Sequence, residues 1–96
     1  YRALCIARGE QQPLPGFDEN SYVVNGEFDT RPLADIADEF LACRMSNVVL
    51  FENLSSEQRT RTGIANGRPV TVQALVWIIA GHTAHHLNVL RERYEV

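Results

Sequence analysis

Two long stretches of the sequence carry apolar residues at helical spacing, and they constrain the fold more than any other feature. In residues 32–54 and 72–95, apolar side chains recur every three or four positions, as they do on one face of an amphipathic helix. In the first stretch they are Leu33, Ile36, Ala37, Phe40, Val48, Phe51 and Leu54. Two such helices bury their apolar faces by packing antiparallel in a bundle. The pattern therefore predicts an all-α fold.

The sequence of the N-terminal third predicts less regular structure than the two long helices. Residues 1–9 have the pattern of a helix end, because Gly9 stands where a helix C-terminus often has glycine. Residues 10–31 contain two prolines close together and predict a loop. Within that loop, Asp18 is placed to cap a short helical turn that runs through Tyr22.

A turn and a small hairpin are predicted between the two long helices, in residues 55–71. Ser55 and Gln58 have the spacing of a capping box, which begins a helical turn. Asn66 and Gly67 form the strongest short signal for a two-residue β-hairpin loop. Thr71 is then placed to cap the last helix, which is predicted over residues 72–95.

The length of 96 residues predicts a single domain over residues 1–96. The chain begins at Tyr1 without a methionine, so we expect it to be part of a longer protein. Two long helices and one helix end leave an apolar groove open. We expect a fourth helix to fill it, either from residues before Tyr1 or from a second copy in a homodimer.

Composition argues against two classes of partner. The formal charge is −3, with 12 acidic and 9 basic residues, whereas nucleic-acid binding needs a basic surface. No apolar run reaches the roughly 18 residues of a membrane span. Cys5 and Cys43 are expected to be small buried apolar residues and not a disulfide, which favours a cytoplasmic location.

The candidate metal ligands are His82 and His86, in the sequence Gly81-His82-Thr83-Ala84-His85-His86. Residues four apart on a helix differ by about 40° in direction and about 6 Å along the axis, so the two imidazoles can meet at one point. Both lie within about 20° of the direction of Leu75, on the face that is expected to be buried, whereas His85 lies about 80° away. The alternative is that His82 and His86 are hydrogen-bonded core residues.

Arg44 and Asn47 are candidate substrate-binding residues, because both fall on or near the apolar face of the 32–54 helix. A guanidinium there needs an anion, and a substrate carboxylate or phosphate would serve. The alternative for Arg44 is an internal salt bridge or a side chain that reaches the rim. Asp18 and Glu19 could supply a base or a ligand if their loop folds over the site, or else cap that loop. Trp77 points away from the histidines and suggests a packing partner there.

The sequence also resembles a known family. The run Ala65–Val72, followed by Leu75–His82 and His85–Tyr94, resembles the C-terminal helix of the DinB/YfiT-like superfamily and the residues before it. Tyr1–Gly9, together with Leu14–Asn20, resembles the end of the second helix of that family and the loop that follows.

The resemblance implies an antiparallel four-helix bundle whose first helix and most of whose second lie outside this chain. It further implies a divalent metal, often nickel or zinc, held by three histidines. His82 and His86 match two of them, and the third is expected upstream of Tyr1. Members act as metal-dependent hydrolases, or as transferases that use a low-molecular-weight thiol, on small-molecule substrates. The alternative is a non-catalytic, stress-associated bundle or dimerisation module.

Overall fold

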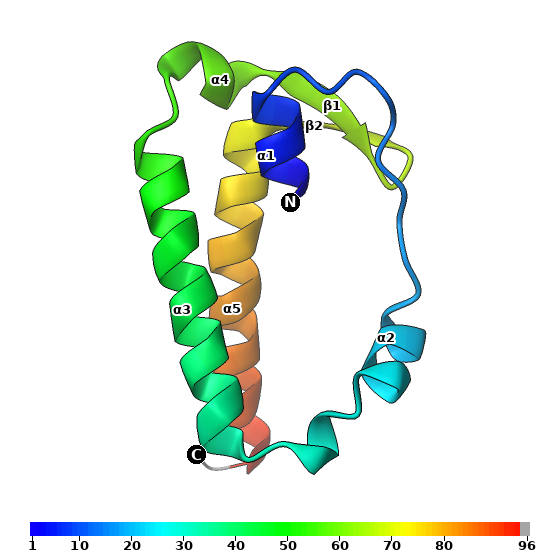
Figure 1. Cartoon of the computed structure of the whole chain (residues 1–96), viewed down its shortest axis with the longest axis vertical. Helices are drawn as coiled ribbons and strands as arrows, with labels where there is room; N and C mark the ends of the chain where they lie inside the picture. The colour runs from blue at the N-terminus through cyan, green and yellow to red at the C-terminus, as the bar shows by residue number, and fades with distance from the viewer. Residues whose placement is uncertain (95–96) are drawn as a thin grey trace. The chain divides into compact units, whose positions relative to one another are not determined.

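The structure is a computed structural model, and it describes residues 1–94 (Figure 1). These residues are mostly helical, with one small antiparallel hairpin directly before the last helix, as the sequence predicts. The chain divides into two compact units. We refer to Tyr1–Pro15 with Ser55–Val96 as the terminal unit and to Gly16–Leu54 as the inner unit.

Helix α1 (Arg2–Ala7) opens the terminal unit and ends as the sequence predicts, at a glycine. Gly9 has a φ of 91°, a left-handed conformation that costs glycine little. The Gly9 N–H donates to the carbonyl of Ile6, and the Glu10 N–H donates to that of Cys5, each over 3.0 Å. This pair of bonds is a Schellman motif, which satisfies carbonyls at the end of the helix.

Helix α4 (Ser56–Thr60) begins with the predicted capping box. The Gln58 N–H donates to Ser55 Oγ over 3.1 Å, and the Ser55 N–H donates to Gln58 Oε1 over 2.8 Å. These reciprocal bonds satisfy two main-chain donors that have no partner inside the helix. The capping box therefore allows a helix of only 5 residues to form between the 20-residue helix α3 (Leu33–Glu52) and the hairpin.

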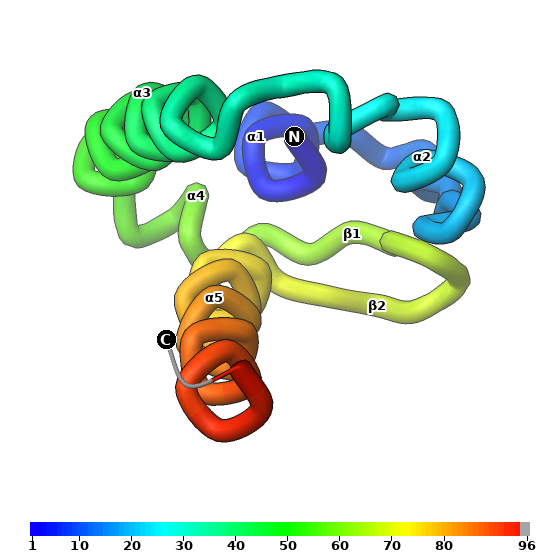
Figure 2. The backbone as a smooth tube through the Cα atoms, turned by 90° about the horizontal axis from the view of Figure 1, so that it is seen from below, coloured from blue at the N-terminus to red at the C-terminus, as the bar shows by residue number. Residues whose placement is uncertain are grey.

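Strands β1 (Thr62–Ala65) and β2 (Arg68–Thr71) pair around Asn66 and Gly67. Both loop residues have positive φ, at 52° and 76°, as a type I′ turn requires. Figure 2 shows the two strands running out together from the start of α5. The other edge of β1 is also occupied, because Leu14 forms a parallel bridge with Ala65.

Helix α5 (Val72–Tyr94) is the longest element, with 23 residues. Its start is capped by Thr71, whose hydroxyl oxygen accepts a hydrogen bond from the Ala74 N–H over 3.0 Å. Helix α1 packs against this start, and β1 packs on α1. The buried apolar residues of the described chain gather here: Ala3, Ile6, Ala7, Ala65 and Val72. The core of the terminal unit therefore lies where α1, the hairpin and α5 meet.

The inner unit contains helix α2 (Glu19–Gly26), a 3-10 helix (Phe28–Thr30) and α3. Asp18 caps α2, because its carboxylate accepts hydrogen bonds from the Asn20 and Ser21 N–H groups over 3.1 and 3.4 Å. Residues 10–31 were predicted to be a loop, and they are one only in part. The cap at Asp18 is strong enough for two turns of helix to form within them. Arg31 also forms an ion pair with Glu39 of α3, at 2.6 Å.

The apolar face of α3 does not form a buried stripe, contrary to the sequence expectation. No residue of α3 is buried, and Leu33 is 80% exposed. The inner unit offers no second long helix for that face to pack on, so helical spacing alone cannot bury it. For the same reason Cys43 of α3, expected to be buried, is exposed. Cys5 of α1 was also expected to be buried and is half-buried; both thiols are free.

Candidate metal site on the last helix

The structure brings His82 and His86 together. Their Nε2 atoms lie 2.9 Å apart and their ring centroids 4.5 Å apart, with the ring planes inclined by 63°. The spacing of four residues on α5 produces this approach, since it stacks the two side chains on one side of the helix. At this separation one Nε2–H donates to the lone pair of the other Nε2.

The donor set suits two positions around one divalent ion. A metal–nitrogen bond is about 2.0–2.1 Å long, so one ion can reach both nitrogens only when they lie less than about 4.1 Å apart. The observed 2.9 Å meets that condition. Within residues 1–94, no group of three His, Cys, Asp or Glu side chains could hold a metal. Among the described residues, His82 and His86 therefore offer two nitrogens and not a full set of donors.

His85 lies beside the pair, next to His86. Its ring centroid is 5.5 Å from that of His86, in an edge-to-face arrangement. The His82 ring contacts that of His86. This placement fits the helical phase, which directs His85 away from the point where the other two converge.

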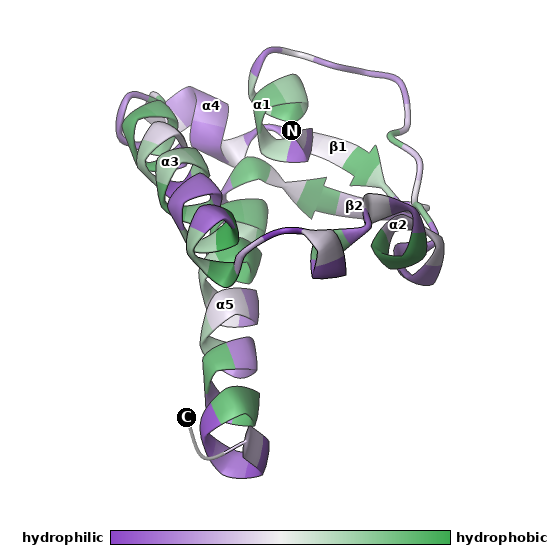
Figure 3. Cartoon of the chain, turned by 60° about the horizontal axis from the view of Figure 1, so that its bottom comes forward, coloured by the Kyte–Doolittle hydropathy of each residue, from purple (hydrophilic) through white to green (hydrophobic). Residues whose placement is uncertain are grey.

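Both histidines are exposed, and this corrects the expectation that they lie inside a buried stripe. Helix α1 has 6 residues and a length of about 9 Å, whereas α5 has 23 residues and a length of about 34 Å. His82 lies about 15 Å beyond Val72 along the axis, past the reach of α1. Figure 3 shows hydrophobic residues along α5 well beyond the turns next to the hairpin.

Arg44 and Asn47, the predicted substrate-binding residues, belong to the inner unit. Both are half-buried on α3, and the Arg44 guanidinium lies 5.0 Å from the centroid of the Phe40 ring. A cation over an aromatic face is a favourable arrangement that needs no external anion. Their role in substrate binding stays a prediction.

Two further predictions concern Asp18, Glu19 and Trp77. Asp18 caps α2 and Glu19 lies in its first turn, which is the capping role that the sequence left open. Trp77 is 70% exposed on α5. A packing partner for its ring stays a prediction.

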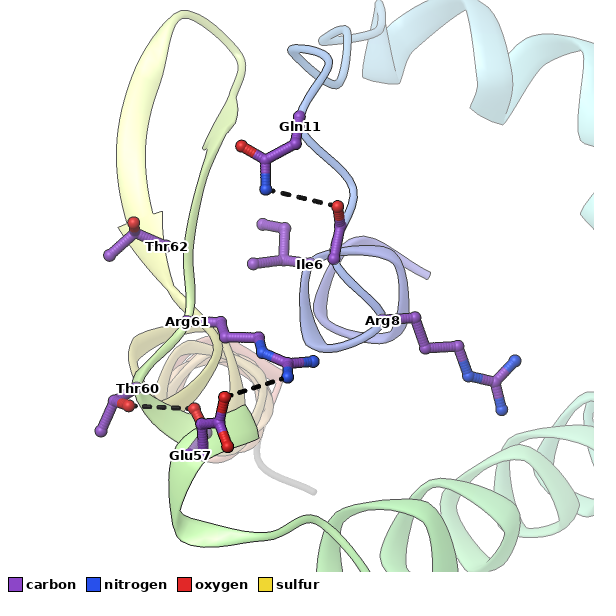
Figure 4. A pocket seen from close by; sticks show the side chains of 8 residues that line it. Ile6, Arg8, Gln11, Glu57, Thr60, Arg61 and Thr62 are labelled. Carbon is purple, nitrogen blue, oxygen red and sulfur yellow. Dashed lines mark hydrogen bonds and ion pairs between the residues drawn. The ribbon is translucent and has the colours of Figure 1, made fainter.

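Sequence reasoning missed one residue that the structure makes prominent, Arg61. Its guanidinium donates to the carbonyl of Ala7, 54 residues earlier, and lies 3.4 Å from the carboxylate of Glu57 (Figure 4). The i, i+4 spacing of Glu57 and Arg61 was a visible signal for the ion pair. The bond to Ala7 has no local signal, because it depends on how the terminal unit folds.

Residues 1–94 contain no helix that combines the length and the apolarity needed to cross a membrane. The comparisons with curated proteins and with solved structures find no match. A sequence model of the DinB superfamily matches residues 1–90. Since that match spans nearly the whole chain, including both histidines, the chain belongs to the DinB superfamily.

Proposed function

We propose that this chain supplies His82 and His86 as two ligands of a divalent metal in a cytoplasmic, metal-dependent enzyme. The observation that supports the proposal is the 2.9 Å separation of the two Nε2 atoms. Two imidazoles whose tips meet can turn both Nε2 lone pairs toward one ion when neither nitrogen carries a proton. The short separation leaves both nitrogens within reach of that ion.

Nickel and zinc are the metals we propose, since imidazole nitrogen suits both. A bound ion would supply Lewis acidity, which lowers the pKa of a water or thiol ligand. That chemistry fits a hydrolase or a transferase that uses a low-molecular-weight thiol. The part played by the described residues is to hold the ion, with His82 and His86 kept four residues apart on a rigid helix.

The proposed function needs two further contributions besides the histidine pair. A third ligand is proposed to come from outside the described residues, which hold no group of three donors. Arg44 and Asn47 are proposed to orient an anionic group of a small-molecule substrate, because a guanidinium and an amide together recognise carboxylate or phosphate oxygens.

The test is the metal content of the full-length protein, measured by mass spectrometry after purification without a metal-affinity step. We expect about one divalent ion per chain in the wild type and a loss of at least about tenfold in His82→Ala and in His86→Ala. His85→Ala is the matched control, since it removes a neighbouring imidazole that is about 100° away from His86 around the helix; it should keep its metal. Negligible metal in all four proteins would contradict the proposal and favour a non-catalytic bundle.

A further inference from the structure

The dipeptide Asn-Gly occurs at two places in this chain, Asn25-Gly26 and Asn66-Gly67, and the structure gives the two pairs opposite surroundings. Asparagine before glycine can lose its side-chain amide without an enzyme, because glycine has no Cβ to keep its main-chain nitrogen away from the asparagine side chain. The sequence alone does not distinguish the two pairs. The structure does, since the first pair ends helix α2 and the second forms the loop of the hairpin.

The pair in α2 is protected from this reaction in three ways. Asn25 Nδ2 donates to the carbonyl of Ser21 over 2.9 Å and lies 3.2 Å from Ser21 Oγ. Gly26 belongs to the last turn of an α-helix, where main-chain N–H groups donate to the carbonyl four residues earlier. A Cβ atom built on Gly26 would overlap with the ring of Phe28, so that ring covers the glycine. Asn25 can therefore react only when the end of α2 unfolds.

The pair in the hairpin has none of these protections. Among the described residues, neither the Asn66 side chain nor the Gly67 N–H has a hydrogen-bond partner. Asn66 is exposed, and a Cβ atom built on Gly67 meets nothing within 4 Å. Figure 2 shows the loop between β1 and β2 at the end of the hairpin away from α5. The attacking nitrogen, its target carbon and the space for a ring are thus all available in this loop.

We infer that Asn66 is a site of spontaneous deamidation, at which the folded protein converts to an isoaspartate form with a loosened hairpin. The Gly67 nitrogen attacks Cγ of Asn66, and the new bond replaces the one from Cγ to the amide nitrogen, which leaves as ammonia with the proton of the Gly67 N–H. Water then opens the cyclic imide at either carbonyl and gives aspartate or isoaspartate, with no change in oxidation state. This reaction involves no metal ligand, so it is independent of the proposed function.

Isoaspartate changes the hairpin more than aspartate does, because its main chain runs through the former side chain and is one carbon longer. A type I′ turn joins two strands by two residues of defined geometry, so the extra carbon disturbs the pairing of Ala65 with Arg68. It also disturbs two bonds to Leu14. The Asn66 N–H donates to the Leu14 carbonyl over 3.0 Å, and the Leu14 N–H donates to the Ile64 carbonyl over 2.8 Å. The isoaspartate form should therefore lose the bridge that fastens Leu14 to β1.

The experiment incubates the full-length protein in mildly alkaline buffer, once folded and once unfolded in guanidinium chloride. Peptide mapping by mass spectrometry measures conversion at both asparagines and distinguishes isoaspartate from aspartate. In the folded protein we expect conversion at Asn66 to be at least about tenfold faster than at Asn25, because only Asn25 requires a helix end to unfold. In the unfolded protein the two rates should become similar. Phe28→Ala uncovers Gly26 and should speed conversion at Asn25 alone.

Hydrogen exchange of the Leu14 amide tests the structural consequence. The isoaspartate form is purified by chromatography and compared with Asn66→Asp, which carries the same added charge without the extra carbon. Asp-Gly also favours a type I′ turn, so Asn66→Asp should keep the protection of the Leu14 amide. The isoaspartate form should exchange this amide faster than both Asn66→Asp and the wild type.

Three results would overturn the inference. Conversion at Asn66 that is no faster than at Asn25 in the folded protein would show that the turn protects its asparagine. Conversion to aspartate alone would show that the loop opens without lengthening the main chain. An isoaspartate form whose Leu14 amide exchanges as slowly as in the wild type would show that the hairpin tolerates the extra carbon.

Discussion

Because α1 approaches β1 closely, the variant Gly63→Ala tests how these two elements pack in the terminal unit. A Cβ atom at position 63 would lie 2.7 Å from Ile6 Cγ1 and 2.8 Å from Ile6 Cδ1. Ile6 is 1% exposed, so its side chain has little room to move aside. The added methyl group must therefore displace α1 or force Ile6 out of a favoured rotamer.

The magnitude follows from two opposing effects. Overpacking a core by one carbon costs about 1–3 kcal/mol, whereas replacing glycine by alanine stabilises by about 0.4–1 kcal/mol through the unfolded chain. We expect Gly63→Ala to lower the free energy of unfolding of the full-length protein by about 1 kcal/mol, measured by urea denaturation. Gly81→Ala is the matched control, because a Cβ there meets nothing within 4 Å. In the middle of α5, that change should stabilise by up to about 1 kcal/mol.

A double-mutant cycle with Ile6→Val tests the mechanism directly. Ile6→Val removes Cδ1, one of the two atoms nearest to the new methyl group. The double variant should lose less stability than the two single variants together, by at least about 0.5 kcal/mol. Additive losses, or a Gly63→Ala protein as stable as the wild type, would refute the argument that Gly63 is required by the packing of Ile6.

Two further predictions concern a helix cap and an ion pair. Thr71→Ala removes the acceptor of the Ala74 N–H and should cost about 1 kcal/mol in the free energy of unfolding, while Thr71→Ser should cost much less; equal losses would argue against the cap. Glu39→Gln breaks an ion pair whose side chains are 36% and 61% exposed, so it should change the free energy of unfolding by less than about 1 kcal/mol. If Glu39→Gln lowers the free energy of unfolding in urea by the same amount at about 1 M salt as at low salt, the pair is not a surface contact that salt screens.

Local signals in the sequence predicted the short elements well. Asn66 and Gly67 predicted the hairpin, and the caps at Asp18 and Ser55 form as their spacing indicates. Each of these depends on bonds between residues within a few positions of one another, and sequence spacing largely decides such bonds. The convergence of His82 and His86 belongs to the same class, since it is set by four residues of one helix.

What the sequence could not predict depends on distant contacts. Helical spacing identified the apolar faces of α3 and α5 but not what covers them, so the expected burial of His82, His86 and Cys43 is wrong for the described residues. The bond from Arg61 to Ala7 and the bridge from Leu14 to Ala65 join residues about 50 positions apart. Such contacts form only when separate elements meet, and no local pattern encodes them.

The hairpin also limits how this protein can associate with itself. Strand β1 pairs with β2 on one side, and on the other side Leu14 bridges Ala65, which occupies the outer main-chain groups of β1 at the end next to the turn. The free edge belongs to β2, and there Pro69 lacks the N–H that an added strand would need. A four-residue edge interrupted by proline is a poor template for the growth of a larger sheet. The edge of β2 is thus a poor place for a further strand to pair.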